Sequence, residues 1–238
     1  MATNELRKRA NWQTLSGSKA AGAELSFFDV FTEAFKGTNF TIISKPRDFK
    51  GIYEKVQLPP LLLAQTYKPN REYNHGVAPD YAIHNKATGK TLYVEVKRQD
   101  GWVEGKKPSA GRGNAHERSC KFFTPGLKKV LQNKGKLGED VLPFWVVFLG
   151  DIARDPKRTR EVTLWYEGVE DHYFMWADTT NPDPLITHFE ERLMPFLLGK
   201  KPKPKVVTPA ETAKVDLGKG QVKEIPISSD RVKPRNRH

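Results

Sequence analysis

Residues 79–99 read PDYAIHNKATGKTLYVEVKRQ, and this stretch predicts two β-strands joined by a short polar turn. The runs at 80–84 and 92–97 are rich in β-branched and aromatic residues, whereas KATGK between them has the composition of a turn. Two such runs around a short turn are typical of a β-hairpin. The stretch therefore predicts a hairpin within a larger sheet.

Three charged side chains of this hairpin predict a metal site. Residues two apart in a strand point the same way, so Glu95 and Lys97 share a face with Tyr93. If Asp80 opens the neighbouring strand, its carboxylate lies beside that of Glu95. With the backbone carbonyl of Val96, the two carboxylates make an oxygen-rich site suited to Mg²⁺, and Lys97 can orient a water or counter developing charge. The alternative is ordinary surface charge, because Pro-Asp and Glu-x-Lys are both common by chance.

Downstream of the hairpin, PSAGRGNAHERSCKFF predicts a polar helix start that can contact nucleic-acid bases. Asn114 can cap a helix that begins at Ala115, which places Glu117 and Arg118 in its first turn. Asn, Arg and Glu side chains are suited to the donors and acceptors of base edges. The alternative is a solvated first turn with ordinary i,i+4 pairs. His116 is expected to be a supporting or exposed residue rather than a catalyst.

The rest of the chain adds helices and strands that together predict one α/β domain. Expected helices cover residues 18–35, a short part of 57–67, 114–131 on either side of Pro125, and a segment from Asp183, the expected N-cap, that Pro195 bends or ends. Expected extended segments are 41–46, 141–150, 161–167 and 172–177.

Charge separates a domain at 1–198 from a tail at 199–238. The net charge of +12 predicts a polyanionic partner such as nucleic acid. Residues 200–238 carry eleven Lys and Arg against four Asp and Glu, so more than half of the net positive charge lies in this stretch. This stretch is rich in Pro, Lys and Gly and poor in large apolar residues, which predicts a flexible basic arm that helps binding non-specifically.

The sequence offers no sign of a membrane or secreted protein. It has no run of eighteen apolar residues, and MATNELRKRANW lacks the apolar segment of a secretory signal. The single cysteine, Cys120, cannot form an intrachain disulfide. These features favour a cytoplasmic protein with no membrane partner.

The chain resembles the EcoRI-like type II restriction endonucleases of the PD-(D/E)xK nuclease superfamily. Four stretches, in this order along the chain, carry the resemblance: PDYAI, YVEVKRQDGWVEG, GRGNAHERSCK and LPFWVVFLGD. The resemblance runs from about residue 6 to about residue 198. It implies an α/β fold with a central mixed sheet of five strands flanked by helices. It also implies a symmetric homodimer that hydrolyses phosphodiester bonds of palindromic double-stranded DNA with Mg²⁺.

Site residues follow from the resemblance by position. It implies that Asp80 and Glu95 are the Mg²⁺ ligands, that Val96 supplies a carbonyl ligand, and that Lys97 is the third catalytic residue. The residues implied to read the inner AATT are Gly113, Asn114, Ala115, Glu117 and Arg118. Within the family the chain resembles enzymes that recognise CAATTG and leave four-base 5′ overhangs. A cognate DNA methyltransferase is expected as a genetic partner, because host DNA needs protection.

Two other functions remain open at this point. A structure-specific repair or junction nuclease of the same superfamily would use Asp80, Glu95 and Lys97. It would not need Asn114, Glu117 and Arg118 at a helix start. A non-catalytic DNA-binding protein would rely on the tail and the helix, and would lose no activity with Asp80→Ala.

Overall fold

The computed structural model describes residues 26–67, 75–101, 103–107 and 116–202, and the backbone of two strands beyond them. The chain divides into two compact units, Met1–Pro202 and Lys203–His238, which are described separately. Within the described residues, no helix is long and apolar enough to cross a membrane.

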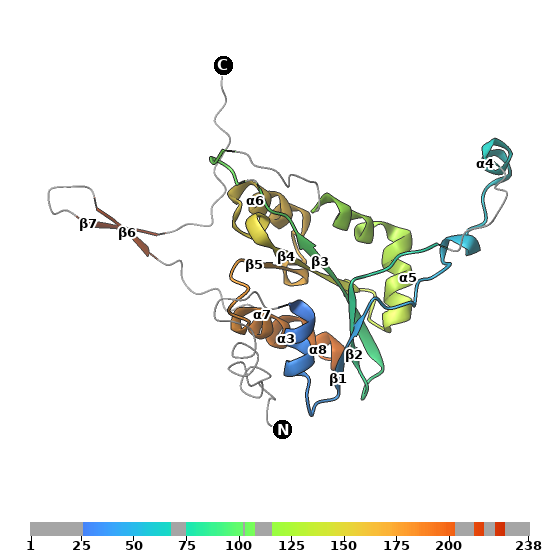
Figure 1. Cartoon of the computed structure of the whole chain (residues 1–238), viewed down its shortest axis with the longest axis horizontal. Helices are drawn as coiled ribbons and strands as arrows, with labels where there is room; N and C mark the ends of the chain where they lie inside the picture. The colour runs from blue at the N-terminus through green and yellow to red at the C-terminus, as the bar shows by residue number, and fades with distance from the viewer. Residues whose placement is uncertain are drawn as a thin grey trace, which may run out of the picture. The chain divides into compact units, whose positions relative to one another are not determined.

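A five-stranded mixed sheet forms the centre of the first unit (Figure 1). Its strands, in spatial order, are β1 (Phe40–Ser44), β2 (Tyr81–Asn85), β3 (Lys90–Arg98), β4 (Phe144–Leu149) and β5 (Tyr173–Trp176). The pairs β1–β2 and β2–β3 are antiparallel, whereas β3–β4 and β4–β5 are parallel. The predicted hairpin and the predicted mixed five-stranded sheet are both confirmed.

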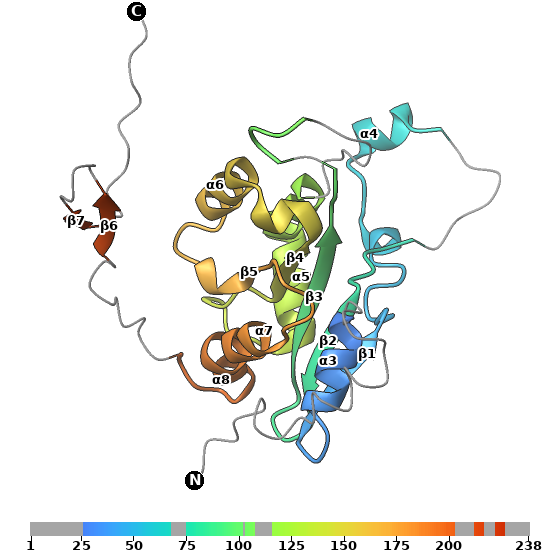
Figure 2. The ribbon, with the colours of Figure 1, turned by 60° about the vertical axis from the view of Figure 1, so that its left-hand side comes forward.

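Helices cover both faces of this sheet. The covering α-helices are α3 (Phe27–Ala34), α5 (Pro125–Gly135), α6 (Pro156–Trp165), α7 (Asp183–His188) and α8 (Met194–Leu197). The other helical elements are α4 (Pro60–Gln65), the short 3-10 helices η1 (Tyr53–Lys55), η2 (Glu117–Phe123), η3 (Gly150–Arg154) and η4 (Glu170–His172), and a π turn, η5 (Phe189–Leu193). Figures 1 and 2 show α3, α7 and α8 on one side of the sheet and α5 and α6 on the other.

Alternation along β3 assigns its side chains to the two layers. Val94 packs in the core that includes α3, α7 and α8, whereas Tyr93 packs in the core that includes α5 and α6. Each core is rich in aromatic residues, and both Val94 and Tyr93 are at most 1% exposed. Since Glu95 and Lys97 alternate in phase with Tyr93, they lie on the α5/α6 face of the sheet.

The first helix starts and ends as its sequence dictates. The Ser26 hydroxyl accepts a hydrogen bond from the backbone N–H of Asp29 at 3.1 Å, which is an N-cap for α3. Gly37 adopts φ +67° just after the helix, a conformation that glycine takes without strain. The prediction of a helix is confirmed for Phe27–Ala34, and its expected first part, 18–25, lies outside the described residues.

The prediction of a strand at 161–167 is wrong, because this segment belongs to the helix α6 and the turn after it. Asp155 caps the helix by accepting from Lys157 N–H at 3.1 Å, and Pro156 occupies its first turn. Val162 and Tyr166, four residues apart, are both fully buried against the sheet. The segment is rich in Val, Thr, Trp and Tyr, which favour strands locally, but burial at helical spacing decides the structure.

A π turn interrupts the C-terminal helical segment just before Pro195, which lies in the first turn of α8 (Met194–Leu197). α7 begins at Asp183, although Pro182 rather than Asp183 is the capping residue. The helix then widens into the π turn, in which the N–H of Met194 donates to the carbonyl of Phe189 five residues earlier. Pro195 has no N–H to donate, and α8 ends at Leu197.

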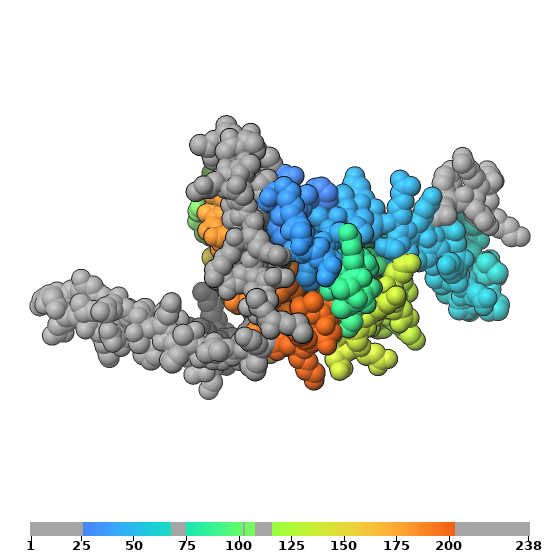
Figure 3. Space-filling view, turned by 90° about the horizontal axis from the view of Figure 1, so that it is seen from below, coloured from blue at the N-terminus to red at the C-terminus, as the bar shows by residue number. Residues whose placement is uncertain are grey.

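The predicted short helix within 57–67 is confirmed as α4, and it contributes nothing to either core. None of its residues is buried, and Leu61, Leu62 and Leu63 are 72%, 50% and 62% exposed. In Figure 3 the teal segment that contains α4 lies at the edge of the view. The helix therefore presents three leucines to the surroundings.

The second unit contains two strands that the sequence analysis does not anticipate. β6 (Thr212–Asp216) and β7 (Val222–Pro226) pair antiparallel with each other. The domain boundary at 198 and the flexibility of residues 199–238 stay predictions.

A buried histidine makes the first unit sensitive to acid. His172 is 3% exposed, and its Nδ1 lies 2.9 Å from the carbonyl oxygen of Phe144. Burial lowers the pKa of His172 from 6.5 to about 4, against the opposing effect of this hydrogen bond. Below pH 6.5 the unfolded chain therefore binds the proton more readily than the folded one, and stability falls until the pH reaches about 4.

We expect this histidine to account for roughly 3 kcal/mol of stability lost between pH 7.5 and pH 4. Urea unfolding of the wild type and of His172→Gln at several pH values in that window measures the effect. The variant is expected to lose stability less steeply than the wild type on acidification. Equal slopes for the two proteins would show that His172 does not contribute.

Candidate active site

The hairpin places Asp80 opposite Glu95 at the start of β2. Tyr81 pairs with Val94, so Asp80, the residue before β2, lies opposite Glu95. The Asp80 Oδ2 accepts a hydrogen bond from the backbone N–H of Val96 at 2.8 Å. On the other side, the carbonyl of Asp80 accepts from the N–H of Lys45 at 2.8 Å. Asp80 is thus held in position from both neighbouring strands.

Glu95 is a buried carboxylate with one paired and one unpaired oxygen. It is 5% exposed, and its Oε1 lies 2.5 Å from the Nζ of Lys97. Its Oε2 is buried and has no hydrogen-bond partner among the described residues. An unpaired buried carboxylate oxygen is costly, and in native proteins it marks a strained or ligand-binding position. The arrangement is suited to a ligand that contributes positive charge.

Two tyrosines border the carboxylates. Tyr166, the C-cap of α6, is fully buried, and this burial raises its pKa, with the charge of Glu95 acting in the same direction. Burial likewise raises the pKa of Tyr81, and the charge of Asp80 adds to the effect. Both phenols therefore stay neutral at physiological pH. Tyr81 stacks on Phe27 and Phe28 on the α3 face of the sheet, whereas Tyr166 lies on the α5/α6 face that carries Glu95.

Oxygen atoms dominate the possible metal ligands. In the described part of the chain, no three His, Cys, Asp or Glu side chains form a group that could hold a metal ion. Asp80, Glu95 and the carbonyl of Val96 together provide a smaller set of two carboxylates and one backbone oxygen. Such hard oxygen ligands, completed by water and by substrate phosphate, match the preference of Mg²⁺.

The expected base-reading residues are only partly described. Gly113, Asn114 and Ala115 lie outside the described residues, so their predicted positions stay untested. Glu117 and Arg118 are exposed at the start of η2, which is a 3-10 helix rather than the expected α-helix. The helical segment after Pro125 is confirmed as α5.

Comparisons with known proteins agree with this geometry. A family model described as "Type II restriction enzyme MunI" matches residues 1–198. The type II restriction enzyme MunI of Mycoplasma sp is 50% identical over 201 residues, which cover 83% of this chain and all of that protein. The chain belongs to the MunI family of type II restriction enzymes. It is therefore a restriction endonuclease, an enzyme that cuts DNA.

A solved structure of a MunI-family enzyme supports the same assignment. The crystal structure of the MunI restriction endonuclease in complex with cognate DNA matches with a TM-score of 0.71 and 50% identity, over 79% of this chain and 98% of that chain. The predicted resemblance to restriction endonucleases and the predicted fold class are confirmed. The individual roles of the site residues stay predictions.

Sequence reasoning missed the surroundings of His116, which is 1% exposed and packs against α6 through Trp165 and Glu161. The signal for α6 was present in the sequence. Asp155 before Pro156 is the same N-cap and first-turn pair that supported the prediction at Asp183.

Proposed function

We propose that this restriction enzyme cuts palindromic double-stranded DNA at CAATTG, with Mg²⁺, and leaves 5′ AATT overhangs. Two observations support the catalytic part of the proposal: Asp80 is bonded to the N–H of Val96, next to Glu95, and Glu95 pairs with Lys97 while its other oxygen is buried and unpaired among the described residues. The 50% identity to MunI supports the proposed site.

The residues present fit a Mg²⁺ ion. The Oε2 of Glu95 lacks a hydrogen-bonding partner among the described residues, and Asp80 supplies a second carboxylate on the neighbouring strand end. Asp80, Glu95 and the carbonyl of Val96 would hold the ion. When bound, Mg²⁺ supplies polarisation of the scissile phosphodiester and lowers the pKa of a coordinated water.

The chain's own residues organise the reacting groups. The N–H of Val96 fixes the orientation of the Asp80 carboxylate at 2.8 Å. Lys97 is placed by its contact with Glu95, with its ammonium group on the same face of the sheet. From there it can orient the attacking water and counter the negative charge that develops on the phosphate. Buried Tyr166 limits water on the α6 side, which strengthens these electrostatic effects.

Recognition is proposed to come from the segment that contains Gly113, Asn114, Ala115, Glu117 and Arg118. The exposure of Glu117 and Arg118 supports this role, because both side chains are accessible to a groove of DNA. A palindromic site presents two identical half-sites, so we propose a symmetric homodimer with one active site for each strand. The basic tail would add attraction to the phosphate backbone that does not depend on sequence.

Digestion of two matched plasmids tests the proposal. The first carries CAATTG sites, and in the second each of these is changed to GAATTC, which keeps the inner four base pairs. With Mg²⁺ we expect discrete fragments from the first plasmid and none from the second, and no cleavage of either in EDTA.

Other outcomes separate the remaining alternatives. Cleavage of GAATTC would agree with recognition of the inner four base pairs but would contradict the proposed outer base pair. Cleavage that requires branched DNA would contradict sequence-specific restriction. Full activity in EDTA would contradict the metal requirement.

A further inference from the structure

The helix α6 holds the chain on both sides of residues 108–115, which connect the catalytic strand β3 to η2. On the β3 side, the N–H of Glu104 donates to Asp155 Oδ1 at 3.0 Å, and the Glu104 carboxylate pairs with Arg160 of α6 at 2.5 Å. On the η2 side, His116 packs on the same helix. Contacts with α6 therefore hold the start of η2 in position, in addition to the covalent connection to β3.

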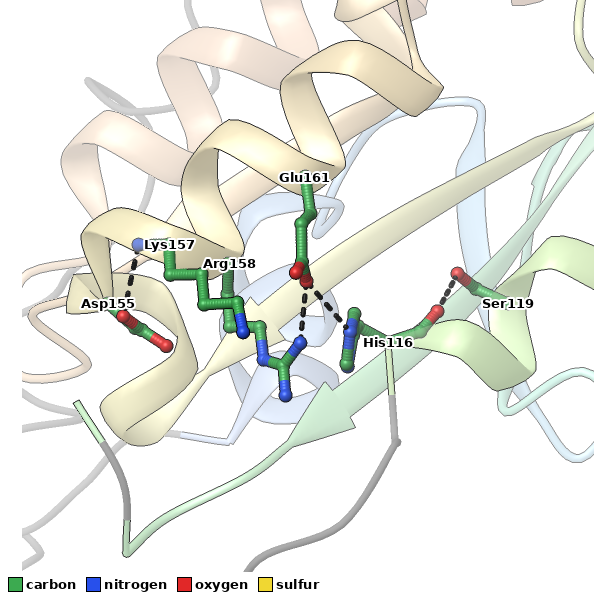
Figure 4. A network of polar contacts seen from close by, with 6 residues as sticks. All are labelled: His116, Ser119, Asp155, Lys157, Arg158 and Glu161. Carbon is green, nitrogen blue, oxygen red and sulfur yellow. Dashed lines mark hydrogen bonds and ion pairs between the residues drawn. The ribbon is translucent and has the colours of Figure 1, made fainter. Parts of the chain in front are cut away.

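His116 contacts α6 by stacking on Trp165 and by a polar contact with Glu161, and Figure 4 shows the second of these. Its ring lies parallel to that of Trp165, with 5.2 Å between centroids and 5° between planes. Its Nε2 lies 3.3 Å from Glu161 Oε2, which also accepts a hydrogen bond from Arg158 at 2.6 Å. The imidazole thus lies between an aromatic ring and a carboxylate whose position an arginine fixes.

The backbone of His116 begins the 3-10 helix. Its carbonyl accepts hydrogen bonds from the Ser119 N–H at 3.2 Å and from the Ser119 hydroxyl at 2.6 Å. The side chain of His116 is therefore anchored to α6, while its backbone sets the first turn of η2. Glu117 and Arg118 follow directly and are exposed.

The same helix borders the cutting residues. Val162 of α6 and the C-cap residue Tyr166 pack in the core on the face of the sheet that carries Glu95, and the charge of Glu95 contributes to the raised pKa of Tyr166. One helix thus contacts the start of η2 through Glu161 and its last residue, Trp165, and its C-cap residue Tyr166 packs on the face of the sheet that carries Glu95. The helix therefore links the start of η2 to the layer that packs on the proposed catalytic face of the sheet.

We propose that His116 is a positioning residue for DNA recognition, which fixes the direction of Glu117 and Arg118 through its contacts with Trp165 and Glu161. This inference rests on the proposed function of the recognition segment. Burial lowers the pKa of His116, with the charge of Arg158 acting in the same direction and Glu161 opposing, so the imidazole stays neutral at pH 7. Its contribution is geometric, and small displacements of a positioned group reduce rates strongly.

Three variants and a control test the proposal. His116→Ala removes both contacts, His116→Phe keeps the ring against Trp165, and Glu161→Gln removes only the charge of a residue whose side chain is 30% exposed. Glu139→Gln is the control, because it makes the same change at an exposed position outside the network. The readouts are kcat/KM on a CAATTG duplex, kcat/KM on duplexes with one inner base pair changed, and the melting temperature.

We expect His116→Ala to lower kcat/KM on CAATTG by about 10²-fold and to lower the ratio between cognate and altered duplexes about tenfold. His116→Phe is expected to keep most of the wild-type kcat/KM on CAATTG. The kcat/KM of Glu161→Gln is expected to lie between the values of His116→Phe and His116→Ala, and that of Glu139→Gln to equal the wild-type value. A merely structural role would lower the melting temperature and reduce both rates equally, without changing the ratio.

The ratio decides the outcome even if one variant fails to fold. If His116→Ala does not fold, an unchanged ratio in both His116→Phe and Glu161→Gln overturns the proposal. If His116→Ala folds and keeps the wild-type ratio between cognate and altered duplexes, that result alone overturns the proposal. Should the wild type cut a site other than CAATTG, the proposed function fails separately, and the same ratios are measured on the site that it does cut.

Discussion

Asp80→Asn and Glu95→Gln are each expected to reduce the rate of DNA cleavage by at least about 10³-fold, which corresponds to the several kcal/mol that a bound metal contributes to the transition state. Both changes keep the size of the side chain but remove a negative oxygen from the proposed metal site. In Asp80→Asn, the amide oxygen of the new side chain would still accept from the N–H of Val96. In Glu95→Gln, the unpaired position would no longer attract a cation.

Cleavage rates under single-turnover conditions, with Mg²⁺ in excess, measure this effect. Asp140→Asn and Glu139→Gln are matched controls, because they make the same substitutions at exposed positions. DNA binding in the absence of metal is expected to persist in the active-site variants. Cleavage at the wild-type rate by either of them would show that the ligands are wrongly assigned.

Lys97→Met is expected to lower the cleavage rate by about 10²- to 10³-fold, the usual cost of losing one preorganised charge or donor at a transition state. Without Lys97, the Glu95 carboxylate, whose side chain is 6% exposed, also loses its counter-charge in the metal-free protein. We therefore expect a loss of stability of about 2–3 kcal/mol, less than for a fully buried pair because Lys97 is 17% exposed.

The double variant Lys97→Met with Glu95→Gln separates the two effects. It removes the buried charge as well as its partner, so we expect stability in EDTA to return toward that of the wild type while cleavage stays absent. Urea unfolding and single-turnover cleavage of the same preparations measure both quantities. A double variant as unstable as Lys97→Met would contradict the pairing of Glu95 with Lys97.

The part of the fold that the sequence predicted well is the part set by local interactions. Alternation of apolar and charged residues fixes the faces of β3, and a short polar turn fixes its pairing with β2. Together they bring Asp80 opposite Glu95 without help from the rest of the chain. The candidate site was predictable for this reason.

The strand preference of its residues concealed the helix α6, although the Asp155–Pro156 pair marks its start. Val162, Thr163 and Trp165 favour a strand in isolation, and only packing of Val162 and Tyr166 on the sheet makes the helix the better solution. The environment of His116 depends on that helix, so it was hidden as well. The unpaired oxygen of Glu95 also required the fold, because its burial comes from distant elements.

Sequencing the DNA ends produced from a duplex library of random sequence tests the central claim most directly, which is that Asp80, Glu95 and Lys97 cut CAATTG. With the wild-type protein and Mg²⁺, we predict that the ends carry a 5′ AATT overhang, with cleavage between the C and the first A of CAATTG, and that Asp80→Asn yields none. Ends at a different sequence, or scattered ends without a common sequence, would contradict it.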